Sequence, residues 1–200
     1  MEITTKSKVS AVIKLIFGAL MVITAILGYS KLPLMYWAEF TFFSNLLGGI
    51  LLITDGILNL KGSSAPMVLY LNVGVGILTV FLVCLLTLFT PNPFNYGGAF
   101  FFLHAINPVG FLLIYILLCE DDCLSRIKRL LATPLLAMAY LLFDYILGNI
   151  RGFFVYGFAM PEMLPVPIAA VVGIVVFLLM MLLGLILLVL NKKAYRNYEY

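Results

Sequence analysis

The sequence has little charge. Only 10% of its 200 residues are Asp, Glu, Lys or Arg, whereas a soluble domain usually carries about 25%. Hydrophobic residues make up 64% of the chain. A soluble fold of this size exposes about a quarter to a third of its surface, and most of that surface would here be apolar. The composition therefore excludes a soluble globular fold and indicates that lipid is the solvent.

Cysteine and histidine are also scarce. The three cysteines, Cys84, Cys119 and Cys123, are too few for a disulfide framework, and we expect reduced thiols. Cys119 and Cys123 stand beside three acidic residues, but a structural zinc site needs four ligands and no histidine is near. We therefore expect no metal and no other cofactor. The net charge of +3 is too small to indicate a nucleic-acid partner.

Signals for processing and for internal repetition are missing as well. No clear cleavage site of small residues follows the first apolar stretch, Ala11–Gly28, so we expect a permanent helix rather than a signal peptide. No internal repeat is strong enough to indicate an inverted-repeat transporter. The links between apolar runs are too short to fold separately, so residues 1–200 are predicted to form one domain.

Long apolar runs dominate what is present. Six runs of about 18 residues or more are bounded by polar or turn residues. They predict an all-α polytopic membrane protein, a bundle of six transmembrane helices. The predicted spans are Ala11–Gly28, Trp37–Leu58, Pro66–Leu88, Ala99–Leu118, Leu130–Leu147 and Val166–Leu190.

The basic residues indicate the direction of insertion, because Lys and Arg are preferentially retained in the cytoplasm. If the N-terminus is cytoplasmic, only Lys31 and Arg151 of the 12 basic residues fall outside. We therefore expect both termini in the cytoplasm and, in a bacterium, an integral protein of the plasma membrane. The cytoplasmic half is expected to be poor in polar groups, with Asp55 and Asn72 as its main examples.

Polar side chains within the spans are few, and three of them share one depth. At a rise of about 1.5 Å per residue, Thr41 lies about 6 Å below the outer end of its span, His104 about 8 Å and Asp144 about 6 to 8 Å. A hydroxyl, an imidazole and a carboxylate are thus predicted to meet in one polar pocket in the outer half. We expect this pocket to open outward or sideways into the outer leaflet.

These side-chain types suit acyl transfer. A hydroxyl becomes a useful nucleophile when a positioned base removes its proton, and histidine, with an unperturbed pKa of about 6.5, is well suited to this. Thr41 or Ser44 is the candidate nucleophile, His104 the base and Asp144 the group that orients the imidazole. The amide of Asn45 or Asn107 is a candidate oxyanion donor.

A wider set of polar residues near this level is predicted to bind substrate. The set comprises Glu39, Ser44, Asn45, Asn107, Tyr140 and Arg151. Structural alternatives remain open for most of them. Ser and Thr commonly bond their own helix backbone, the two asparagines can join helices, and Asp144 can pair with Arg151 two turns away. An intramembrane histidine is harder to explain as structural.

Two short motifs resemble a known family. The run Phe40-Thr41-Phe42-Phe43-Ser44-Asn45-Leu46-Leu47 and the run His104-Ala105-Ile106-Asn107-Pro108 resemble the androgen-induced family of membrane proteins and their bacterial six-helix relatives. The tract Tyr140–Phe158, with Arg151-Gly152 and Tyr156-Gly157-Phe158, is similar to the aromatic stretch after the fifth helix of those relatives. The resemblance covers roughly residues 37–160.

The resemblance implies an intramembrane threonine hydrolase. Animal members of the family cleave fatty acid esters of hydroxy fatty acids with one threonine and one histidine, which match Thr41 and His104 here. The continuation Phe-Phe-Ser-Asn and the context His-x-x-x-Pro depart from the animal pattern and are closer to the bacterial relatives. Fold transfers more safely than substrate across such a resemblance.

The leading hypothesis is a hydrolase of lipid or acyl esters, whose partner is a lipid or amphiphilic small molecule in the membrane. One alternative is a small-solute-binding membrane subunit of a vitamin transporter, and another is a lipid-binding or assembly protein without catalysis. On the first span only Thr24 and Gly28 are small residues at a four-residue spacing, which gives little sign of a docking face for a transporter partner. The sequence does not indicate the oligomeric state.

Overall fold

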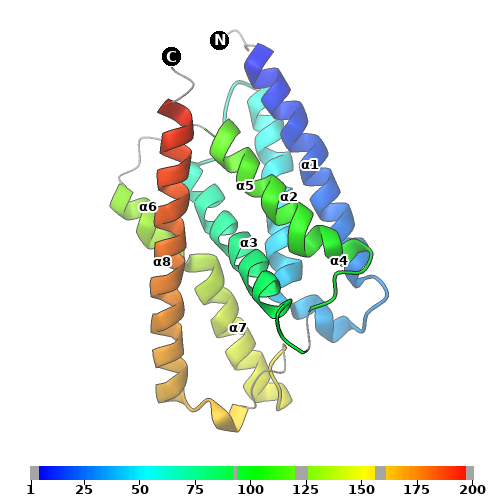
Figure 1. The fold of residues 1–200 in the computed structure, drawn as a ribbon, viewed down its shortest axis with the longest axis vertical. Coiled ribbons are helices and arrows are strands. Elements are labelled where there is room, and N and C mark those ends of the chain that lie inside the picture. Colours follow the sequence, from blue (N-terminus) through cyan, green and yellow to red (C-terminus); the bar gives the residue numbers. More distant parts are fainter. Residues whose placement is uncertain (1–4, 92–93, 120–125, 156–160, 197–200) are drawn as a thin grey trace.

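The computed structural model describes residues 5–91, 94–119, 126–155 and 161–196. Within these ranges every regular element is a helix and no strand occurs. Six helices are long and apolar enough to cross a membrane, which confirms the predicted all-α bundle of six spans. They run up and down the long axis of the molecule, and α1 begins at the same end at which α8 finishes (Figure 1).

The first three spans are single helices, whereas the fourth and fifth are composite. The single helices are α1 (Thr5–Tyr29), α2 (Phe40–Leu60) and α3 (Met67–Thr87). The fourth span consists of α4 (Ala99–Phe101), the π-helix η2 (Phe102–Ile106) and α5 (Asn107–Leu118). The fifth consists of α6 (Arg126–Ala132) and α7 (Leu135–Arg151), and the sixth is α8 (Val166–Arg196). Two short 3₁₀ turns, η1 (Leu34–Ala38) and η3 (Pro161–Met163), lie in the connections.

Several helix limits differ from the predicted ones by a few residues, and the start of the second span and the interior of the fifth have a structural cause. The second span begins at Phe40 rather than Trp37, because η1 forms a separate turn and the backbone of Glu39 after it is extended (φ −67°, ψ 143°). The fifth span is broken between α6 and α7 at Thr133 and Pro134, because proline has no N–H to donate and disfavours helical geometry in the residue before it.

The backbones of α1 and α2 lie in close contact. A Cβ atom added to Gly18 would lie 2.8 Å from the carbonyl oxygen of Gly49, and one added to Gly49 would lie 2.8 Å from that of Gly18. Two helical turns further along α2, a Cβ on Gly56 would lie 3.0 Å from the carbonyl oxygen of Ala11. Ala11 and Gly18 on α1 are seven residues apart, as are Gly49 and Gly56 on α2. They therefore do not form the four-residue pattern of small residues that is typical of helix packing in membranes. The packing face of α1 is therefore used within the chain.

A buried ion pair joins the helices at the end where α1 begins. Lys14 Nζ lies 2.7 Å from Asp55 Oδ2 and donates to Asn59 Oδ1 at 2.9 Å. The Tyr70 hydroxyl donates to Asp55 Oδ2 at 2.7 Å, and the N–H of Ala65 donates to Asp55 Oδ1 at 2.6 Å. Lys14 and Asp55 are only 2% and 1% exposed. Lys14 is therefore a buried partner of Asp55, a charge pair that the polar residues expected in the spans did not include.

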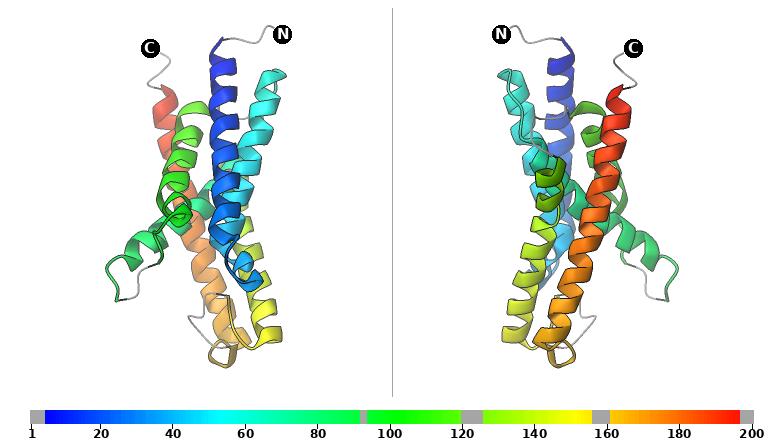
Figure 2. Two further views of the ribbon diagram at one scale, coloured as in Figure 1. Left: turned by 90° about the vertical axis from the view of Figure 1, so that its right-hand side faces the viewer. Right: turned by 90° about the vertical axis from the view of Figure 1, so that its left-hand side faces the viewer.

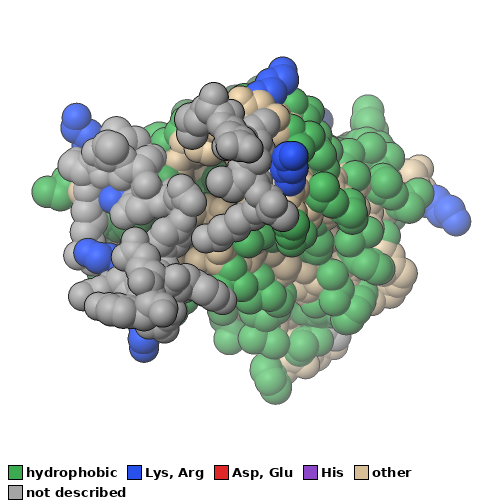
Figure 3. All heavy atoms as spheres, turned by 90° about the horizontal axis from the view of Figure 1, so that it is seen from above, with side chains coloured by type: hydrophobic (Ala, Val, Ile, Leu, Met, Phe, Trp, Pro, Cys, Tyr) green, Lys and Arg blue, Asp and Glu red, His purple; other side chains and the backbone are tan. Residues whose placement is uncertain are grey.

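The last span is tied to the same end by an amide. Asn191 on α8 donates to the carbonyl oxygens of Tyr115 and Cys119, at 2.9 Å and 3.1 Å. These carbonyls belong to the final turn of α5 and the residue after it, where a helix has no backbone donors left to pair with them. Lysine side chains are spread around this end of the molecule, and much of its described surface is hydrophobic (Figure 3). The exposed lysines there are Lys8, Lys61, Lys128, Lys192 and Lys193.

The opposite half of the bundle is less closely packed. The second half of α3 leans away from the other helices (Figure 2). Residues just after this helix have few neighbours, and Phe89 is 86% exposed. The departure of α3 leaves a space between α3, α7 and α8.

Candidate functional site

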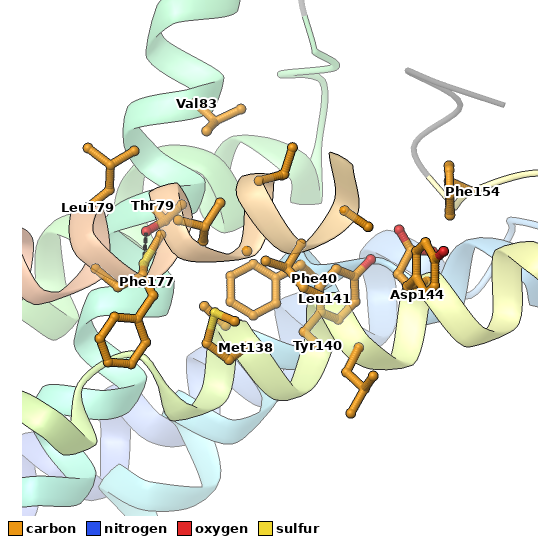
Figure 4. A pocket seen from close by; sticks show the side chains of 18 of the residues that line it. Phe40, Thr79, Val83, Met138, Tyr140, Leu141, Asp144, Phe154, Phe177 and Leu179 are labelled. Atoms are coloured by element: carbon orange, nitrogen blue, oxygen red, sulfur yellow. Dashed lines mark hydrogen bonds between the residues drawn. The ribbon is translucent and has the colours of Figure 1, made fainter. Parts of the chain in front are cut away.

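The space beside α3 holds a cavity of about 840 Å³. Side chains from the start of α2 and from α3, α7 and α8 form its walls, and Figure 4 shows Asp144 and Phe154 at one end with Phe177 and Leu179 at the other. The volume is within the range of about 300 to 1,000 Å³ that is typical of small-molecule sites. Leu142 and Ile174 line the cavity and are more than half exposed, so it reaches the lipid-facing side of the bundle.

The lining of the cavity is almost entirely apolar. Its hydroxyl and carboxyl groups come from Thr41, Thr79, Tyr140, Asp144 and Tyr145, and Asp144 is the only charged side chain among the residues that line it. An apolar space with a few polar groups at particular points suits an amphiphile, whose chain is buried while its polar part meets those groups.

Thr41 is the predicted nucleophile, and it stands at the wall of this cavity. It lies in the first turn of α2 and is 4% exposed. Ser44, the other candidate, does not line the cavity, and its hydroxyl donates to the carbonyl oxygen of Thr41 at 3.3 Å. Ser44 thus makes the bond to its own helix that the structural alternative predicted. Position therefore favours Thr41 over Ser44.

His104, the predicted base, lies in the middle of the π-helix η2 and is 3% exposed. Pro108 stands four residues later and has no N–H to donate to the carbonyl of His104, so the ordinary α-helical bond cannot form there and the turn widens. Single π-helical turns are frequent at functional sites. The spacing His-x-x-x-Pro is the sequence signal for this distortion.

The hydrogen bond of His104 determines which of its ring nitrogens is basic. Nδ1 lies 2.9 Å from the carbonyl oxygen of Asn95. A carbonyl oxygen only accepts, so Nδ1 carries the hydrogen and Nε2 of the neutral ring is the acceptor. The rings of Phe94, Tyr96 and Phe100 surround the imidazole, with centroids 5.5 to 6.0 Å away. Phe94 also lines the cavity, so His104 lies one aromatic ring behind the cavity wall.

One amide group links the backbones of the two predicted catalytic residues. Asn45 Nδ2 donates to the carbonyl oxygen of Thr41 at 2.9 Å and to that of Leu103 at 3.3 Å. Leu103 directly precedes His104. The first turn of α2 and the π-helix η2 are therefore joined through the Asn45 amide.

The asparagines of this region also join helices. Asn107 Nδ2 donates to Asn45 Oδ1 and to Thr24 Oγ1, each at 3.0 Å, so α1, α2 and α5 meet at this point. Both asparagines are fully buried, and neither lines the cavity. Their amide N–H groups are already donated to protein acceptors, as the structural alternative predicts. Asn107 Oδ1 has no hydrogen-bond partner among the described residues.

Asp144, the predicted orienting group, lines the cavity, but its hydrogen bond is to the backbone of Val155 and not to His104. Its Oδ1 accepts from the N–H of Val155 at 3.0 Å, while the Nδ1 side of His104 faces Asn95. The backbone carbonyl of Asn95 thus occupies the place that Asp144 was expected to take. Asp144 and Arg151 form no ion pair in the described part of the chain, and Arg151 is exposed at the end of α7.

The remaining predicted binding residues lie in different places. Tyr140 lines the cavity, with its ring 4.8 Å from that of Phe40. Glu39 lies outside the cavity lining and accepts from the Tyr29 hydroxyl at 2.6 Å, which joins the end of α1 to the start of α2. Burial raises the pKa of the Glu39 carboxyl, and the bond from Tyr29 opposes that shift.

No metal-binding cluster occurs within the described ranges, where no three His, Cys, Asp or Glu side chains come together. Cys119 is a buried free thiol. Cys123, the acidic run before it and the motif Tyr156-Gly157-Phe158 lie outside those ranges.

Comparisons of the chain with protein-family models, with curated proteins and with solved structures found no match.

Proposed function

We propose that this protein is an intramembrane hydrolase of lipid or acyl esters, with Thr41 as nucleophile and His104 as base. One observation carries the proposal. A buried threonine lies at the wall of an apolar cavity, and the Asn45 amide joins its backbone to that of Leu103, the residue before His104. His104 Nδ1 donates to a carbonyl, which leaves Nε2 as the acceptor. Hydroxyl and imidazole are the pair that nucleophilic catalysis of acyl transfer needs.

In the proposed reaction, His104 Nε2 removes the proton from the hydroxyl of Thr41 while Oγ1 attacks the carbonyl carbon of the ester. The bond from that carbon to the alcohol oxygen breaks, and the imidazolium returns the proton to the leaving alcohol. The acyl group remains on Thr41 as an ester. A water molecule, deprotonated by the same nitrogen, then releases the acid and restores Thr41.

The cavity suggests how the substrate is held. Its apolar length suits a hydrocarbon chain, and its lipid-facing residues between α3, α7 and α8 suit a chain that arrives from the bilayer. We place both termini in the cytoplasm, since the exposed lysines gather at the end where α1 begins, and we place the cavity in the outer half. In a bacterium the membrane would be the plasma membrane.

A lipid-binding protein without catalysis is the second candidate, because an almost wholly apolar cavity suits that role equally well. The solute-binding transporter subunit has less support. The small residues Ala11 and Gly18 of α1 pack against α2.

The test is hydrolysis of nitrophenyl esters with short, medium and long acyl chains by the purified protein in nanodiscs. Thr41→Ala and His104→Ala are each expected to lose about 10²-fold or more in rate, since a positioned base alone contributes about 10² to 10⁴-fold. Thr54→Ala is the matched control, because Thr54 is an exposed threonine on the same helix. If folded Thr41→Ala hydrolyses these esters as fast as the parent, the proposal fails. Binding of lipid without hydrolysis by the parent would establish the second candidate.

A further inference from the structure

The segment Phe94–Gly98, here called the strap, crosses over His104 just before α4. Its Asn95 carbonyl accepts from His104 Nδ1 at 2.9 Å. The rings of Phe94 and Tyr96, on either side of Asn95, pack on the imidazole with centroids 6.0 Å and 5.5 Å away. The strap thus supplies both the hydrogen-bond partner and part of the apolar surroundings of the imidazole.

The shape of the strap depends on the side chain of Asn95. Asn95 Oδ1 accepts from the N–H of Gly97 at 2.7 Å, which closes a turn two residues long. Asparagine favours such turns because its side chain replaces a backbone acceptor. Gly98 then takes φ +58° and ψ −127°, a conformation that essentially only glycine adopts. The side chain of Asn95 and the absence of one at position 98 together aim the Asn95 carbonyl at the histidine.

We propose that Asn95 is a positioning residue of this site. Its side chain holds the turn whose carbonyl keeps His104 in the tautomer with hydrogen on Nδ1, which leaves Nε2 as the basic nitrogen. The tautomer itself does not depend on the proposed function, but its catalytic meaning rests on it. The signal in the sequence is Asn95-Tyr96-Gly97-Gly98, a turn nine residues before the histidine.

The group that meets His104 Nδ1 is the neutral carbonyl of Asn95 and not a carboxylate. In a triad a carboxylate orients the imidazole and also stabilises its charged form. A second charge so deep in an apolar region is costly to bury, whereas a carbonyl fixes the tautomer without that cost. Here the carbonyl of an exposed turn orients the ring, while the carboxylate of Asp144 bonds elsewhere.

Replacement of Asn95 tests this directly. The Asn95 side chain is exposed, so Asn95→Ala removes the bond to Gly97 without opening a cavity in the bundle. Asn95→Asp keeps an oxygen acceptor for Gly97 and is the conservative variant. Asn149→Ala is the matched control, because Asn149 is an exposed asparagine that bonds only to its own helix, at the carbonyl of Tyr145.

His104 is the only histidine in the chain, so ¹⁵N-labelled histidine yields a single imidazole spectrum without assignment. The purified protein, carrying a tag without histidine, is measured in nanodiscs at about pH 8, above the ordinary imidazole pKa of about 6.5. The parent, Asn95→Asp and Asn149→Ala are expected to show hydrogen on Nδ1 only. Asn95→Ala is expected to lose that single tautomer and to show hydrogen on Nε2 in part of the molecules.

Two results would overturn the proposal. One is a parent spectrum with hydrogen on Nε2, which needs no variant. The other is an unchanged spectrum in Asn95→Ala that keeps its helical circular dichroism; if that variant does not fold, Asn95→Gly, which also has no side-chain acceptor for Gly97, decides in its place. Failure of ester hydrolysis is a separate outcome, because the spectrum reports the tautomer whether or not any ester is cleaved. Where hydrolysis is observed, Asn95→Ala should slow it and Asn95→Asp should restore it.

Discussion

Glu39 shows how much a single residue can depend on one partner. Its carboxyl stands between η1 and α2, and the hydroxyl of Tyr29 is the donor that meets it, at 2.6 Å. Partial burial without a cation raises the pKa of this carboxyl. Asp55 differs in its number of hydrogen-bond partners, because a lysine, a phenol and a backbone N–H all donate to its carboxylate.

The raised pKa of Glu39 predicts a pH-dependent stability. Because the folded protein favours the protonated carboxyl, the contribution of Glu39 is complete below its ordinary pKa of 4.5 and is lost as the pH rises through the raised value. Glu39→Gln keeps an acceptor for Tyr29 but cannot ionise. Thermal unfolding across this pH window should show the parent losing stability relative to Glu39→Gln. The exposed Glu162→Gln is the control, and parallel profiles for the parent and Glu39→Gln would contradict the prediction.

Among the elements, α1 and α2 depend most on small residues. Their backbones approach so closely that Gly18 and Gly49 leave no room for a methyl group. The fourth span shows the opposite use of local sequence, because Pro108 widens the helical turn that contains His104. Both effects follow from backbone chemistry, one from a missing Cβ and the other from a missing N–H.

Gly49→Ala is therefore expected to destabilise the protein. The added Cβ would lie 2.8 Å from the Gly18 carbonyl oxygen, and relief of such overpacking typically costs about 1 to 3 kcal/mol. Gly173→Ala on α8 is the matched control, because its Cβ would have only Met138 nearby, at an ordinary 3.6 Å. Thermal unfolding in detergent measures both, and equal midpoints for the two variants would rule out the close α1–α2 contact.

Across the whole molecule, a buried ion pair and its hydrogen bonds join the helices at one end, and the cavity lies toward the other. The ion pair of Lys14 and Asp55, with the bonds of Tyr70 and Asn59, joins α1, α2 and α3, and Lys14 also reaches the carbonyl of Leu118 at the end of α5 at 3.5 Å. The cavity lies in the half where α3 leans away. If the proposed function holds, the bonds at one end keep the helices together while a lipid chain occupies the cavity at the other.

Loss of either charge of the ion pair should weaken this anchor. Lys14→Met or Asp55→Asn is expected to cost about 3 to 5 kcal/mol, because the remaining partner stays buried without its counterpart. The double variant should recover a large part of the loss. Lys8→Met, at an exposed position of the same helix, is the control. Additive losses in thermal unfolding of the double variant would show that the two side chains are not coupled.

The number, order and approximate limits of the six spans could be predicted from the sequence alone. The reason is local: a bilayer requires about 20 consecutive apolar residues in each helix, and every backbone bond is made within it. The π-helical turn was not predicted, although Pro108, which has no N–H to donate to the carbonyl of His104, is its signal in the sequence.

The choice of partners was decided only by the tertiary structure. Depth along a helix is fixed by counting residues, but rotation about its axis depends on how the neighbouring helices pack. Asp144 therefore turns toward Val155 and the cavity, and the carbonyl of Asn95 meets His104 in its place. Lys14, which the count of basic residues assigned to the cytoplasmic side, points inward to Asp55. Packing of all six helices also creates the cavity beside Thr41, because no single span contains its walls.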